Sequence, residues 1–81
     1  MTSRQEITIQ NPQISLKRDQ HGKTYFFILD PASNSAYFAF PNSVKKGWLD
    51  LQTKWTQAKL IHLTLSSHDM KIIHSLQVFT R

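Results

Sequence analysis

The aromatic residues of this chain are concentrated in one short stretch. Six of the nine lie between residues 25 and 40, in two runs separated by a polar segment. Stacking of a nucleobase on an aromatic ring contributes about 1–3 kcal/mol per base and tolerates any base sequence. Rings gathered on a surface would therefore suit single-stranded nucleic acid, whereas the same rings inside a small domain would be ordinary core.

Basic residues flank the aromatic stretch in sequence. They form two groups, one of Lys17, Arg18, His21 and Lys23 and the other of His68 and Lys71. Ten Lys and Arg against five Asp and Glu give a formal net charge of +5, which favours polyanionic partners. Lysine and arginine in loops would hold phosphates without reading bases.

The same chain offers little for catalysis or for metal binding. It has no cysteine, which excludes thiolate metal sites and a Cys nucleophile, and two glycines cannot form a Gly-rich phosphate loop. Residues 66–69 (Ser-Ser-His-Asp) contain the residue types of a catalytic triad, but these types are also typical of turns. His62 and His74 would face each other for only one pairing of the last two strands, and two imidazoles are too few for zinc. We expect no enzyme, no cofactor and no metal.

The segments that would position these residues are predicted to be short strands. Apolar residues alternate before and after Asn11-Pro12 but change parity there, which predicts one bent or bulged edge strand. Residues 23–29 are apolar on both faces and predict a central strand. Further strands are expected at 35–40, 59–66 and 72–79.

One segment has helical rather than strand-like spacing. Its apolar residues are Val44, Trp48, Leu51 and Trp55. They predict a helix within 44–55, with Asn42 or Ser43 as N-cap. Gly47 would then lie in the helix interior at a cost of about 1 kcal/mol, and a strand over 48–51 is the alternative.

This order of elements predicts a mainly β fold with one short helix. We expect a small five-stranded OB-like barrel that forms a single domain over residues 1–81. An SH3-like barrel is the alternative, and a helix between the third and fourth strands favours the OB-like barrel.

The pairing of the central hairpin decides which rings would be available to a ligand. A loop that places Leu29 opposite Ser35 would gather Tyr25, Phe27 and Tyr37 on one face and leave Phe26, Phe38 and Phe40 in the core. A shift of one residue would exchange the faces. The candidate nucleic-acid-binding residues are Tyr25, Phe27 and Tyr37 for stacking and Lys17, Arg18, Lys23 and Lys71 for phosphates.

The function predicted from these residues is binding of single-stranded DNA or RNA with little sequence preference. The alternative is a protein-interaction or assembly subunit that uses the same aromatic face for a protein partner or a homodimer. The longest apolar runs, such as residues 25–29, are far shorter than the ~20 residues of a membrane-spanning helix. We therefore expect no membrane partner and a cytoplasmic location.

Overall fold

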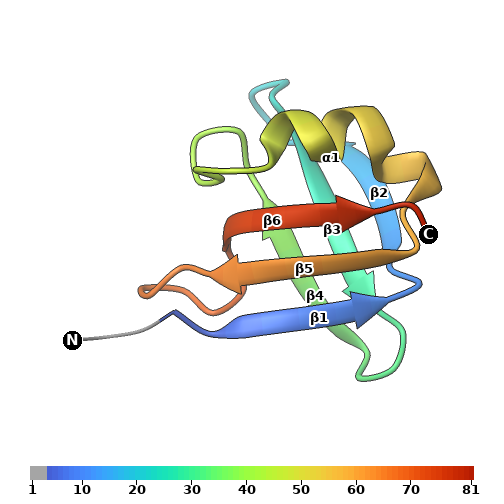
Figure 1. Cartoon of the computed structure of the whole chain (residues 1–81). Helices are drawn as coiled ribbons and strands as arrows, with labels where there is room; N and C mark the ends of the chain where they lie inside the picture. Colours follow the sequence, from blue (N-terminus) through green and yellow to red (C-terminus); the bar gives the residue numbers. More distant parts are fainter. Residues whose placement is uncertain (1–3) are drawn as a thin grey trace.

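Six short strands and one α-helix form the described part of the computed structural model, residues 4–81 (Figure 1). Residues 1–3 of the predicted 1–81 domain lie outside it. The elements are β1 (Glu6–Gln10), β2 (Gln13–Arg18), β3 (Thr24–Asp30), β4 (Ser35–Ala39), α1 (Trp48–Lys54), a 3-10 turn (Trp55–Gln57), β5 (Leu60–Leu65) and β6 (Ile73–Phe79). The prediction of a mainly β protein with one short helix is confirmed.

The strands form two three-stranded antiparallel sheets, with the orders β1-β5-β6 and β2-β3-β4. The sheets pack against each other with their strands crossing steeply, and α1 lies along β6 (Figure 1). Alternation along each strand sends every second side chain between the sheets. The largest fully buried side chains of the core are Ile9, Ile28, Ile61, Leu63, Leu65 and Ile73 from the strands and Leu51 from α1.

The predicted bent edge strand is present as two strands in different sheets. Asn11 adopts a positive φ of 52° and Pro12 has no N–H to donate, so the ladder is interrupted between β1 and β2. The chain turns here, and the backbone N–H of Asn11 donates to the carbonyl oxygen of Lys59 at 2.7 Å. β1 then pairs with β5, and β2 pairs with β3.

On the opposite side, the backbone pairing that could close a barrel is limited, among residues 4–81, to two isolated parallel bridges. Phe38 of β4 is bridged to Ile72, and Lys46 is bridged to Ser75 of β6. Neither bridge extends into a continuous ladder, so the described strands do not form a closed barrel. The prediction of five strands in a barrel is therefore replaced by six strands in two sheets.

The predicted helix is confirmed at Trp48–Lys54, but its predicted start is wrong. Gly47 is the N-cap, with φ 99° and ψ 0°, so it precedes the helix instead of interrupting it. A side chain at Gly47 would overlap the carbonyl oxygen of Leu76. Ser43, a predicted N-cap, instead donates its hydroxyl to the carbonyl oxygen of Phe40 at 3.1 Å and closes the turn after β4.

Aromatic packing and one carboxylate attach α1 to the sheets. The Trp48 ring centroid lies 5.4 Å from that of Phe26. The carboxylate of Asp50 accepts hydrogen bonds from the Lys54 ammonium at 2.8 Å and from the backbone N–H of Val78 at 2.9 Å. These bonds, the Lys54 bond foremost, lower the pKa of Asp50 below its usual value.

Candidate functional site

The β3–β4 hairpin pairs one residue away from the predicted register. Leu29 lies opposite Ala36, whereas the sequence interpretation placed it opposite Ser35. The reason is that Asp30 remains in the strand and pairs with Ser35, which leaves a turn of four residues. Asn34 closes this turn with a positive φ of 58°, and its N–H donates to the carbonyl oxygen of Asp30 at 2.7 Å.

The shift exchanges the two faces of β4. Tyr37 lies opposite Ile28 and packs against the core, so its predicted place beside Tyr25 and Phe27 is wrong. Phe38 lies opposite Phe27 on the outer face, where the sequence interpretation had placed core. Phe26 is 2% exposed, and its predicted place in the core is confirmed.

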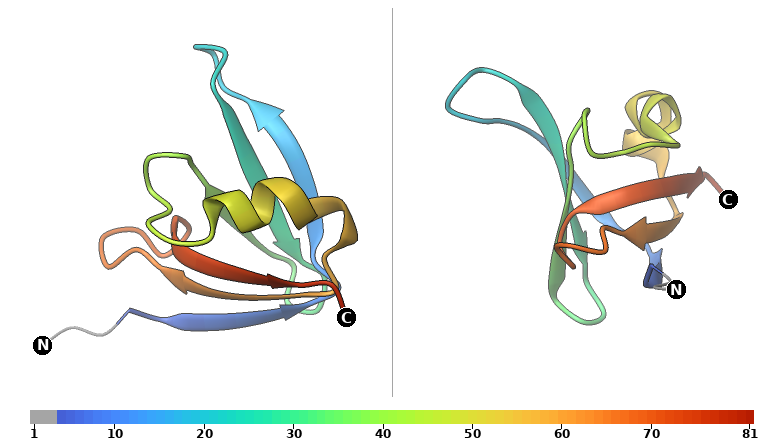
Figure 2. Two further views of the ribbon diagram at one scale, coloured as in Figure 1. Left: turned by 45° about the horizontal axis from the view of Figure 1, so that its top comes forward. Right: turned by 90° about the vertical axis from the view of Figure 1, so that its left-hand side faces the viewer.

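Four partly exposed rings gather on the outer face of the β2-β3-β4 sheet. This aromatic face consists of Tyr25 and Phe27 of β3, Phe38 of β4 and Phe40 just after β4. Phe38 is central, with ring centroids 6.2 Å from Tyr25, 5.6 Å from Phe27 and 6.1 Å from Phe40. Within residues 4–81, no strand or helix lies over this face (Figure 2, right). The face therefore offers ring surface to a ligand.

Two basic residues at the end of β2 point in different directions. Lys17 lies opposite Tyr25, and its ammonium sits 5.4 Å from the Phe27 ring centroid, over the aromatic face. Arg18 lies opposite Thr24, so strand alternation directs it to the other side of the sheet. The structure thus brings Lys17 to the candidate site and leaves Arg18 off the aromatic face.

A pocket of about 370 Å³ joins the aromatic face to both neighbouring loops. We call it the central pocket, and its lining is Asp19, Tyr25, Phe38, Phe40, Asp69, Lys71 and Ile72. Asp19 comes from the β2–β3 turn, and Asp69 and Lys71 come from the β5–β6 loop. The Phe38 N–H donates to the carbonyl oxygen of Lys71 at 2.7 Å, which holds this loop against the sheet.

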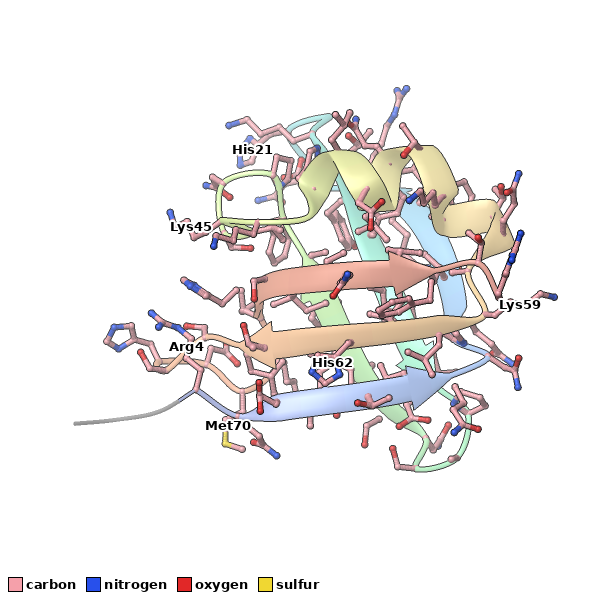
Figure 3. All side chains as sticks on the ribbon, viewed as in Figure 1. Arg4, His21, Lys45, Lys59, His62 and Met70 are labelled. Carbon is pink, nitrogen blue, oxygen red and sulfur yellow. The ribbon has the colours of Figure 1, made fainter. Side chains whose placement is uncertain are left out.

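Two flanking pockets extend the central pocket in opposite directions. One includes His21 and Lys23 and shares Asp19 and Phe40 with the central pocket. The other is lined by Asn34, Ser35, Ala36, Tyr37, Met70 and Lys71, and it shares Lys71 with the central pocket. Figure 3 shows His21 and Met70, one from each flanking pocket, towards opposite ends of the molecule. The three pockets therefore form one row that passes the aromatic face.

Two aspartates that the sequence analysis did not select shape the loops of the central pocket. Oδ1 of Asp19 accepts the backbone N–H groups of His21 at 2.8 Å and Lys23 at 2.9 Å. Oδ1 of Asp69 accepts the backbone N–H of Lys71 at 3.0 Å. An aspartate that accepts a hydrogen bond from the backbone N–H two residues later is a common turn arrangement. The signal in the sequence was therefore an aspartate within each expected turn.

The remaining histidines do not assemble into a site. His62 lies opposite Gln77, not His74, and its Nδ1 is 2.8 Å from the Thr8 hydroxyl. It lies on β5, on the side of the β1-β5-β6 sheet that faces the viewer in Figure 3. Residues 4–81 contain no group of three or more His, Asp or Glu side chains arranged to hold a metal ion.

Comparison with protein-family models, curated proteins and solved structures finds no match for this chain. No helix among the described residues is long and apolar enough to cross a membrane.

Proposed function

We propose that this protein binds single-stranded DNA or RNA in the cytoplasm with little sequence preference. One observation carries the proposal: the aromatic face is uncovered and lies between two loops that bear lysines. Rings beside cations are the combination that sequence-tolerant binding of single strands uses, since bases stack and phosphates are held.

Each group has a defined role in this proposal. Bases stack on the aromatic face, with Phe38 and Phe40 taking the part that the sequence analysis gave to Tyr37. Lys17, Lys23 and Lys71 lie along the row of pockets or over the rings, and they hold phosphates. Arg18 lies off the aromatic face, so it does not hold a phosphate there. Its positive charge attracts the nucleic acid during approach.

The connectivity supports an open form of an OB-like fold. The segment before β3 is shared by both sheets, and α1 lies between β4 and β5 in sequence. β4 also forms a parallel bridge with Ile72, the residue just before β6. If β1 and β2 count as one broken strand, β3 and β4 are the second and third strands. In OB-folds these strands and the two adjacent loops bind oligonucleotides.

A second candidate function uses the same face for a protein. Partly exposed rings on an uncovered sheet face also suit docking of a protein partner or a second copy of this chain. The two functions differ in ligand and in salt dependence, because phosphate contacts weaken steeply as salt rises.

Size-exclusion chromatography with light scattering, with and without oligothymidine, separates the two. Nucleic-acid binding predicts a monomer that shifts to a complex at low salt and returns to a monomer at high salt. A stable dimer that ignores the oligonucleotide at every salt concentration would overturn the nucleic-acid proposal and favour self-association.

A further inference from the structure

The central pocket combines ring walls with two carboxylates, which is unusual chemistry for a phosphate site. Tyr25, Phe38 and Phe40 supply the rings, and Asp19 and Asp69 enter from opposite loops. Each carboxylate uses Oδ1 for backbone N–H groups. Among residues 4–81, neither aspartate forms an ion pair or a hydrogen bond through Oδ2, so each carboxylate keeps one oxygen free to accept from a ligand.

A free carboxylate oxygen discriminates between ligand groups. It repels a phosphate, so the sugar-phosphate chain is expected to follow the lysines at the rim and a base to enter the pocket. Cytosine and adenine carry exocyclic amino groups that donate hydrogen bonds, whereas thymine and uracil present a carbonyl oxygen at the corresponding position. A hydrogen bond to a charged acceptor is also among the stronger kinds.

We propose that the central pocket selects a base with an exocyclic amino group over uracil or thymine. This proposal rests on the proposed function, and it adds a preference at one position of an otherwise sequence-tolerant strand. The rings stack on the base, while Asp19 or Asp69 accepts a hydrogen bond from its amino group. The volume of about 370 Å³ lies within the usual range for ligand pockets, about 300–1,000 Å³.

The test compares oligodeoxycytidine with oligodeoxyuridine of equal length by fluorescence anisotropy near neutral pH and at one salt concentration. These two probes share the backbone and the pyrimidine ring and differ in the amino or carbonyl group at C4. One charge-assisted hydrogen bond predicts that the deoxycytidine probe binds roughly tenfold to 150-fold more tightly.

Conservative variants assign the preference to the carboxylates. Asp19→Asn and Asp69→Asn each keep an oxygen for the backbone N–H groups and replace the free acceptor with a donor. Together they should abolish the preference for cytosine or reverse it. Asp30→Asn is the matched control, because Asp30 closes a turn through Ala32 and Ser33 and lines none of the three pockets. It removes one negative charge, as each single pocket variant does, and should leave the preference intact.

Each outcome has a definite meaning. Equal affinity of the wild-type protein for both probes would overturn the base preference and leave the proposed function standing. A preference that survives the double variant would overturn the role of the carboxylates. Failure to bind either probe at low salt would overturn the proposed function itself, and the inference with it.

Discussion

Phe38 and Tyr37 are neighbours in sequence on opposite faces of β4, so replacing each one with alanine tests the two faces separately. The Phe38 ring lies at the centre of the aromatic face, between Phe27 at 5.6 Å and Phe40 at 6.1 Å. If it stacks on a base, Phe38→Ala should weaken binding by about 1–3 kcal/mol, which raises Kd roughly fivefold to 150-fold.

Both substitutions are expected to reduce stability, and only one is expected to reduce affinity. Phe38→Ala removes a partly exposed ring and with it three aromatic pairs, each contributing about 0.5–1.5 kcal/mol. Tyr37→Ala removes a ring that packs against the core beside Ile28, so a loss of about 2–3 kcal/mol is expected. Because Tyr37 lines only a flanking pocket, its loss should change Kd by less than about threefold.

The assay is an anisotropy titration with a labelled oligonucleotide, made at a temperature where melting curves show both variants folded. Phe38→Leu serves as the control, because it keeps apolar bulk while removing the ring. It should recover stability more than it recovers affinity. The reasoning is refuted if folded Phe38→Ala binds like the wild-type protein, or if Tyr37→Ala weakens binding as much as Phe38→Ala does.

Three further predictions concern electrostatics and stability. If three lysines each neutralise one phosphate, the logarithm of the binding constant should fall with the logarithm of salt concentration at a slope of about −2. An affinity that stays constant in titrations from low to physiological salt would contradict this. Gly47→Ala should lower the free energy of unfolding by more than about 2 kcal/mol in urea titrations, because Gly47 has a positive φ and the added Cβ would overlap the Leu76 carbonyl. An unfolding midpoint near that of the wild-type protein would show that the turn can shift. Because the pKa of Asp50 is lowered in the folded state, its ionised carboxylate stabilises the fold at pH values above the usual pKa of 3.8, and this stabilisation is lost as pH falls through the folded-state pKa. Asp50→Asn should therefore lower the free energy of unfolding by about 1 kcal/mol near neutral pH and approach the wild-type value in acid. A difference between the two proteins that does not change with pH would exclude this ionisation as the cause.

Most of the fold could be predicted from local patterns, because each strand carries its own hydrophobic alternation. The central position of β3 follows from apolar residues on both of its faces, and it is confirmed by the order β2-β3-β4. The position of the helix follows from apolar spacing, since Leu51 is fully buried and Trp48 contacts Phe26. These features depend on residues near one another in sequence.

The candidate site was harder to predict, because it depends on the register of a single hairpin. Strand side chains alternate with a period of two, so an error of one residue in a turn moves a whole strand to the other face. Asp30 could end the strand or begin the turn, and its side-chain bonds to Ala32 and Ser33 show how it does both. The pairing of the β2–β3 turn with the β5–β6 loop in one pocket depends on tertiary packing, which no local pattern encodes.

The division of one N-terminal segment between two sheets has a consequence for the order of folding. β2, β3 and β4 are joined by short turns, whereas β1 contacts β5 across a large sequence separation, with Thr8 and His62 54 positions apart. Local pairings form faster than distant ones, because less chain entropy is lost in closing the loop. The three-stranded meander can thus form as soon as residues 13–40 are available, while the core-facing side chains of Phe26 and Ile28 stay uncovered until the later elements arrive, Trp48 and Trp55 among them. We expect the turn at Asn11-Pro12 to mark the boundary between an early local folding unit and a late non-local closure.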